Sequence, residues 1–447
     1  MGELAELPPY RLDQRIAQAA RALRKAHVDL RGEGPDKARD PLRSFRDICT
    51  RTLYRELCER ADDPFLAGAR DWVAFLTIER VTWGDAVRAA RALHDPRVEI
   101  ERPERLRASM RTLQQRFRAE TSEERRALWG EALALGAPPL ADAARILVER
   151  RAAAMEQLDR LDREGFEVPS DPPEAAQAVA ESVLAMTDDV FDASREWTET
   201  IGRSLARSAD RGWPPRLSLR WIHDLFARTD LAGGLDLDLG PLPETLGGTS
   251  FARALAQFGA AFARAALPGG APFVLANLPY DLREARRAAL FGGLAADPCF
   301  GVRGLGLTRD RARDQAREMA RALVISLRLD AARVLLRSAL LLPVRDQAPR
   351  FEEISERALG KALPTSLLGV LPRLSAGDAT RLFGAVLAAR DRRSLIEDFE
   401  EDWFRNPRAA EAIRDEQSRL SAEPRVTRAC LDEALVFLNR SLREIAA

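Results

Sequence analysis

Apolar residues recur three and four positions apart along most of this chain, and Ala, Arg, Leu and Glu fill the positions between them. These residue types favour helices, whereas the β-branched residues that favour strands are few. The pattern predicts helices over 12–30, 42–58, 140–161, 173–206 and 308–342. We therefore expect a mainly α-helical protein.

One short segment departs from the helical pattern. Residues 234–240 read Gly-Leu-Asp-Leu-Asp-Leu-Gly, which places three leucines on one face of a strand and two aspartates on the other. The two aspartates fit either a metal-binding Asp-x-Asp or the solvated face of that strand. The sequence predicts a small β element here within an otherwise helical fold.

The length of 447 residues exceeds what one ordinary hydrophobic core organises. Clusters of Gly and Pro, which end helices, occur at 32–35, 165–173 and 212–215. The middle cluster is the best candidate for a boundary. We therefore predict a large two-lobed fold, with an N-terminal helical lobe over 1–165 and a second helical lobe over 173–447.

The charges of the chain cancel, with 69 basic and 69 acidic residues. Proteins that bind nucleic acids or anionic membranes normally carry a basic excess, so no nucleic-acid partner is expected. Lysine occurs only at Lys25, Lys37 and Lys361, which makes the chain arginine-rich. A genome that favours Arg and Ala codons explains this bias. Arginine also binds carboxylates through its planar fork.

Several features indicate a cytoplasmic protein without a membrane span. The most apolar segment, 322–344, is interrupted by charged residues and is too broken to cross a bilayer. The N-terminus is acidic and lacks the apolar region of a signal peptide. Four scattered cysteines fit reduced, mostly buried thiols.

Metal ligands are scarce in this sequence. The three histidines, His27, His94 and His223, are too far apart in the sequence to share a helix face, and no Cys-x-x-Cys pair occurs. A tetrahedral zinc site therefore has no local nucleus. We expect no bound metal and no cofactor.

An acidic motif suggests an alternative function. Asp188, Asp189 and Asp192 form an Asp-Asp-x-x-Asp sequence within a predicted helix, with the first and last four residues apart on one face. Such carboxylates can hold Mg²⁺ against a diphosphate, and the motif is similar to that of all-helical isoprenoid synthases. No suitable second acidic motif follows, because the acidic run 397–402 has the wrong pattern. A solvated acidic helix face also explains the motif.

A predicted helix over 249–265 is the most informative stretch. Phe251, Leu255, Phe258 and Phe262 follow at i, i+4, i+7 and i+11, which forms one apolar stripe. Gly259 lies in the middle of this helix, where glycine costs about 1 kcal/mol relative to alanine. We therefore expect another element to approach this glycine closely.

Residues 255–262 read Leu-Ala-Gln-Phe-Gly-Ala-Ala-Phe. This segment resembles the Leu-His-Glu-Phe-Gly-His-Ala-Leu helix of the thimet oligopeptidase and oligopeptidase F type of zinc metallopeptidases (gluzincins). In that family the two histidines bind zinc and the glutamate is the general base. The resemblance places the metal positions on Ala256 and Ala260, the base on Gln257 and the third ligand on Glu284. It also implies a large helical fold.

The residues at these positions do not fit peptidase chemistry. Ala256 and Ala260 cannot donate a lone pair to zinc, and Gln257 cannot accept a proton. The family also uses histidines and usually a tyrosine after the zinc helix, whereas this chain has no histidine after His223 and no tyrosine after Tyr280. We therefore expect a degenerate zinc helix and no enzyme.

The leading hypothesis is a catalytically inactive, metallopeptidase-like pseudoenzyme that binds a peptide or a protein partner. Arg253, Gln257 and Arg264 would line what remains of the groove, and the arginines could hold a peptide carboxylate through paired hydrogen bonds. The alternatives are the Mg²⁺-dependent isoprenoid synthase and a plain helical adaptor protein. The sequence does not identify the partner or the oligomeric state.

Overall fold

The computed structural model describes residues 8–32, 39–158 apart from 61, 102, 104 and 121, 173–192, 218–226, 231, 237, 239, 242, 248–369 apart from 280, 377–418 and 428–446. Within these ranges the chain is mainly α-helical, as predicted. Only two short strands occur in them, β1 (Val98–Ile100) and β2 (Leu106–Ala108), which pair antiparallel with Glu99 opposite Arg107.

The elements before residue 160 are all helical apart from that hairpin. In chain order the helices are α1 (Pro9–Gly32), η3 (Arg43–Phe45), α2 (Arg51–Cys58), α3 (Pro64–His94), α4 (Met110–Ala119), α5 (Glu123–Gly136) and α6 (Pro138–Gln157).

The elements after residue 172 are also helical. In chain order they are α7 (Pro173–Asp192), α9 (Leu219–Phe226), α10 (Gly248–Ala265), α11 (Phe273–Ala276), α12 (Leu282–Gly293), η6 (Leu294–Ala296), α13 (Pro298–Arg303), α14 (Arg309–Ala339), α15 (Val344–Leu359), η7 (Thr365–Gly369), α16 (Asp378–Phe399), η8 (Trp403–Arg405), α17 (Pro407–Ser418) and α18 (Arg428–Ala446).

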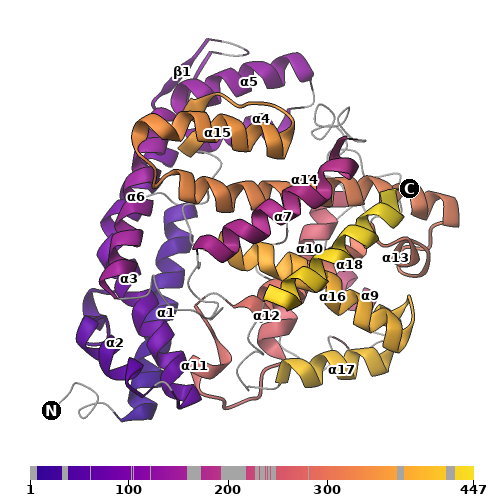
Figure 1. The fold of residues 1–447 in the computed structure, drawn as a ribbon, viewed down its shortest axis with the longest axis horizontal. Helices are drawn as coiled ribbons and strands as arrows, with labels where there is room; N and C mark the ends of the chain where they lie inside the picture. Colours follow the sequence, from indigo (N-terminus) through magenta and orange to yellow (C-terminus); the bar gives the residue numbers. More distant parts are fainter. Residues whose placement is uncertain are drawn as a thin grey trace.

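The helices form two sides of the molecule (Figure 1). Helices α1, α2, α3 and α6 stand on one side, and α9, α10, α12, α16, α17 and α18 stand on the other. The first side has its own apolar core from α1, α2 and α3. The second side has its core around α10 and α12, and a further core around α7, α14 and α15 also includes Val148 of α6.

A polar clasp joins the two sides at α11. The Asp13 carboxylate of α1 accepts hydrogen bonds from the backbone N–H groups of Phe273 and Val274, at 2.9 and 3.0 Å. The Trp72 indole of α3 donates to the Asn277 carbonyl at 2.6 Å. Because α11 lies shortly before α12, the clasp fixes where α1 stands relative to α12.

The predicted helices are confirmed for α1, α6 and α14, while the single helix predicted over 42–58 is wrong. There the chain forms the short η3 and then α2, because the Thr50 side chain accepts from Leu53 N–H and starts a new helix. α7 begins at Pro173 as predicted and is described to Asp192, so the predicted extension to 206 lies outside the described residues.

Two further predictions fall largely outside the described residues. Of the predicted β element at 234–240, only Leu237 and Leu239 are described, and neither is in a strand. Of the predicted boundary at 165–173, only Pro173 is described, so the division into lobes 1–165 and 173–447 stays a prediction.

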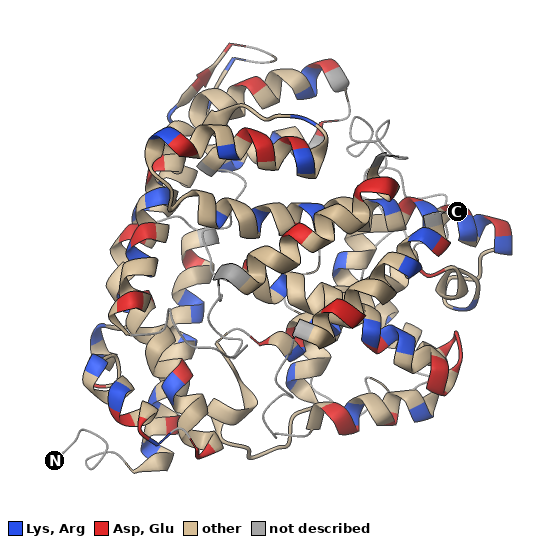
Figure 2. Ribbon diagram, in the orientation of Figure 1, with Lys and Arg blue, Asp and Glu red and all other residues tan. Residues whose placement is uncertain are grey.

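The expectation of mostly buried thiols is wrong. All four cysteines are free, but only Cys49 is buried, while Cys58, Cys299 and Cys430 are partly exposed. None of the described helices is long and apolar enough to cross a membrane. Basic and acidic positions are interspersed over the helices (Figure 2), in keeping with the net charge of zero.

Candidate functional site

The predicted helix over 249–265 is α10, and its apolar stripe is core. Phe251, Leu255, Phe258 and Phe262 are fully buried. Phe258 stacks on Phe226 of α9 with ring centroids 4.4 Å apart and meets Phe291 of α12 edge-on at 5.2 Å. This stripe anchors α10 and determines which of its faces points away from the core.

Gly259 lets α12 approach α10 closely, as the sequence predicts. A Cβ atom at Gly259 would lie 2.2 Å from the Arg287 carbonyl oxygen, which is shorter than any real contact. One turn earlier on α10, the Ala256 side chain faces Gly292, where an added Cβ would lie 3.2 Å from it. The two helices therefore pack through small residues, and Ala256 lies within this contact.

A second face of α10 carries the polar residues singled out in the sequence. Arg253, Gln257, Ala260 and Arg264 are spaced at i, i+4, i+7 and i+11, so they share one face, which we call the α10 polar face. Arg253 is exposed and the other three are half-buried. The structure thus brings the predicted groove residues together on one face.

Glu284, the predicted third-ligand position, lies in the first turn of α12 beside the end of this face. Asp281 caps α12 by accepting the Glu284 N–H, which fixes the start of the helix. The Glu284 carboxylate pairs with Arg264, with Oε1 2.5 Å from Nη1. Burial raises the pKa of Glu284, while the charges of Arg264 and, from α1, Arg24 oppose that rise.

These residues do not fit a zinc ion. Ala256 and Ala260 offer no ligand atom, and the nearby carboxylates of Glu284 and Asp281 pair with Arg264 and Arg283. Across the described part of the chain, no three His, Cys, Asp or Glu side chains are grouped so that they could hold a metal ion. The arrangement can instead bind polar groups through arginine and glutamine side chains.

The acidic motif of the alternative hypothesis lies on α7, and its two described carboxylates are open to solvent. The Asp188 side chain is 46% exposed and pairs with Arg328 at 2.9 Å, and the Asp189 side chain is 77% exposed and pairs with Arg443 at 2.7 Å. The Asp192 side chain lies outside the described residues. Both described carboxylates serve as partners for arginines, so this geometry gives the isoprenoid synthase no support.

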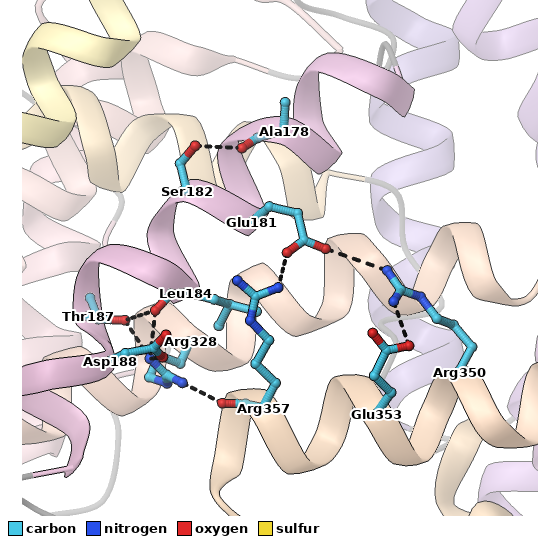
Figure 3. Close-up of polar contacts among 10 residues, drawn as sticks. All are labelled: Ala178, Glu181, Ser182, Leu184, Thr187, Asp188, Arg328, Arg350, Glu353 and Arg357. Carbon is cyan, nitrogen blue, oxygen red and sulfur yellow. Dashed lines mark hydrogen bonds and ion pairs between the residues drawn. The ribbon is translucent and has the colours of Figure 1, made fainter.

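Arg328 shows what this part of α7 does (Figure 3). Its side chain is 1% exposed and donates to the Leu184 carbonyl at 3.0 Å, to the Thr187 hydroxyl at 2.8 Å and to the Arg357 carbonyl, as Figure 3 shows. It also donates to the Ala358 carbonyl at 2.9 Å and lies 4.3 Å from the Phe191 ring centroid. It therefore ties α7 to the end of α15. The acidic face that the sequence predicts to be solvated therefore also binds arginine side chains of neighbouring helices, through Asp188 and Asp189.

One charged cluster was missed by the sequence analysis. Glu79 of α3, 3% exposed, accepts from Arg151 of α6 at 2.8 Å and lies 3.0 Å from Nε2 of His27 of α1. Burial favours a higher pKa for Glu79, but the Arg151 charge and the His27 contact outweigh it and lower the pKa to about 2. The three residues are far apart in the sequence, so no local motif could reveal them.

Comparisons with known proteins give a likeness of fold. No model of a protein family matches this chain, and no curated protein is similar to it. PZ peptidase A, solved with an inhibitor, matches with a TM-score of 0.51 and 10% identity over 97% of each chain. A protein described as an oligoendopeptidase F of Bacillus anthracis str. Ames matches with a TM-score of 0.47 and 12% identity over 90% of this chain and 82% of its own.

The match to PZ peptidase A shows that the chain shares the large helical fold of that protein over nearly its whole length. The resemblance predicted from the sequence is therefore confirmed as a likeness of fold to a peptidase, and no further. The same finding corrects the expectation that the protein is not an enzyme, because PZ peptidase A, whose fold it shares, is a peptidase.

Proposed function

We propose that this chain is a peptidase-like helical protein that binds a peptide or a protein segment along the α10 polar face. The observation that carries the proposal is the arrangement of Arg253, Gln257, Ala260 and Arg264 on one face of a helix whose opposite stripe is fixed in the core. We also propose that α10 and Glu284 occupy the position in the fold at which the peptidases have their zinc site.

The dimensions of the face suit a short stretch of peptide. Arg253 and Arg264 are eleven residues apart on α10, which corresponds to about 16 Å at a rise of about 1.5 Å per residue. An extended peptide covers that distance with about five residues. Two guanidinium groups at the ends, with Gln257 and the small Ala260 between them, provide charged anchors and room for a backbone.

The free cysteines and the absence of a spanning helix among the described residues support a further part of the proposal, a cytoplasmic location. The proposed ligand is thus a peptide or an exposed segment of another cytoplasmic protein.

Selection from a random-sequence dodecapeptide library, with the full chain as bait, tests the proposal. We expect enriched peptides, whose synthetic forms bind in calorimetry. Arg253→Glu should weaken this binding at least tenfold, because it reverses a charge at one end of the face. Arg408→Glu on α17, another exposed arginine, is the matched control and should leave binding unchanged.

Failure to enrich any peptide, or equal binding by both variants and the unmodified protein, would contradict the proposal. Each bound peptide is also analysed by mass spectrometry after incubation with and without added zinc. Cleaved products would show that the face belongs to an active enzyme, and an intact peptide would show that it acts in binding.

A further inference from the structure

Arg283 lies in the first turn of α12 and joins that turn to α11. Its Nε and Nη2 atoms donate to the two carboxylate oxygens of Asp281, each at 3.3 Å. Nη2 also donates to the Ala276 carbonyl at the end of α11, at 3.2 Å. The side chains of Arg283 and Asp281 are 10% and 14% exposed, so solvent screens their contact only weakly. Arg283 therefore holds the start of α12 to the end of α11.

α11 is in turn fixed to the first side of the molecule. Asp13 of α1 accepts the first two N–H groups of α11, and Trp72 of α3 donates to the carbonyl group that follows its last residue. Val274 of α11 is fully buried in the core of that side. Gly68 of α3 leaves room for it, because a Cβ atom at Gly68 would lie 2.5 Å from the Val274 carbonyl oxygen. α11 therefore has one place relative to α1 and α3.

In the other direction, the contacts of Arg283 lead to the α10 polar face. Asp281 accepts the Glu284 N–H at 3.2 Å, and Glu284 pairs with Arg264 in the last turn of α10. The side chains of Arg264 and Glu284 are 30% and 33% exposed, so their ion pair alone holds Arg264 only loosely. A fixed first turn of α12 restricts where the Glu284 carboxylate can lie, and the Arg264 guanidinium follows that carboxylate.

We propose that Arg283 is a positioning residue of the peptide site. By holding the first turn of α12 to α11, it sets the place of Glu284 and thereby the direction of Arg264 at one end of the α10 polar face. This inference rests on the proposed function and adds the way in which the first side of the molecule supports the site. Arg283 acts through Arg264 and does not itself contact the peptide.

A double-mutant cycle tests the inference, with a peptide from the library whose Kd is below about 1 μM, so that binding stays measurable after two tenfold losses. Arg283→Met removes the paired hydrogen bonds and keeps a long side chain. We expect it to weaken peptide binding about tenfold in calorimetry. In a protein that already carries Arg264→Gln, the same substitution should change binding less than about twofold, because the group through which Arg283 acts is gone.

Arg286→Met is the matched control. Arg286 also lies on α12 and also donates from Nε and Nη2 to one carboxylate, that of Asp391 of α16, at 3.2 and 2.6 Å. Its side chain is 18% exposed, and its ion pairs lead to α16 and α17. Peptide binding should therefore stay within about twofold of that of the unmodified protein. A general loss of stability would affect the two variants alike.

Asp13→Asn tests the same chain of contacts from its far end, and it keeps the inference testable if Arg283→Met does not fold. Asp13 is only partly buried, and asparagine has nearly its size but offers one acceptor oxygen in place of two. We expect a loss of peptide binding of about threefold to tenfold, which should likewise disappear when Arg264→Gln is also present.

Unchanged binding by Arg283→Met would overturn the inference, as would equal weakening by Arg283→Met and Arg286→Met. Losses for Arg283→Met or Asp13→Asn that persist undiminished beside Arg264→Gln would also overturn it. Each of these results leaves peptide binding itself intact. Absence of binding by the unmodified protein to every peptide would instead overturn the proposed function, and the inference would fail with it.

Discussion

Gly259 is the residue on which the packing of α10 most depends. Alanine is the better helix former by about 1 kcal/mol, so helix propensity alone predicts that Gly259→Ala stabilises the protein. The Arg287 carbonyl, however, leaves no space for a Cβ atom. We expect Gly259→Ala to lower the free energy of unfolding by about 1–3 kcal/mol, because the backbones of two helices must separate.

Gly84 provides the matched control for this change. It also lies within a long helix, α3, but a Cβ atom there would meet nothing within 4 Å. Gly84→Ala should therefore raise the free energy of unfolding by about 0.5–1 kcal/mol, as measured by urea denaturation. If both substitutions stabilise the protein, the inference that α12 packs closely against Gly259 of α10 is wrong.

Glu79 should make stability depend on pH. Its pKa of about 2 in the folded protein lies below the ordinary value of 4.5, so the folded state binds fewer protons in this range. The stabilisation is therefore complete above about pH 5 and is lost as the pH falls towards 2. Between about pH 5 and pH 3 this residue should account for a loss of about 2 kcal/mol.

Comparison with Glu79→Gln isolates this contribution. The variant is less stable at neutral pH because Arg151 loses its partner. Its stability should fall less steeply than that of the unmodified protein between pH 5 and pH 3, as followed by denaturation at each pH. Parallel curves for the two proteins would show that Glu79 does not remain ionised through its contacts with Arg151 and His27.

At the scale of elements, α7 is attached to its neighbours through arginines. Arg328 is buried and donates to carbonyl groups of α7 and α15 as well as to Asp188. Glu181 of α7 pairs with Arg350 and Arg357 of α15 (Figure 3). The buried contact should matter far more than the exposed ones, because solvent screens exposed pairs.

Arg328→Met should lower the free energy of unfolding by about 3–5 kcal/mol, because it leaves buried carbonyl groups without their donor. Arg443→Gln removes the exposed ion pair with Asp189 and should change the free energy of unfolding by less than about 1 kcal/mol. Urea denaturation measures both. Equal losses in the two variants would contradict the docking role of Arg328.

Sequence periodicity predicts elements here because each helix carries a regular apolar stripe, as α10 does at Phe251, Leu255, Phe258 and Phe262. It does not predict which side chains meet. Arg328 with Leu184 and Arg151 with Glu79 are contacts between distant parts of the sequence. From the sequence alone, the acidic motif at Asp188 fits a metal site or a solvated face, because its partner Arg328 lies on another helix.

At the scale of the molecule, the fold was predictable in class and in family likeness, whereas the site was predictable only in part. Arg253, Gln257 and Arg264 share one face of α10 because they lie on one helix, while their role as groove residues stays a prediction. The clasp between Asp13 and α11 was not expected, since it joins residues far apart in the sequence. Long-range packing of this kind leaves no local sequence pattern.

Site-specific photo-crosslinking tests the central claim, peptide binding on the α10 polar face, most directly. A photoreactive amino acid replaces Arg253 in one protein and Val436 of α18, an exposed control position, in another. After irradiation with a selected peptide, mass spectrometry should find the peptide attached at position 253 and not at 436. Equal attachment at both positions, or none at 253 while binding persists, would contradict the account.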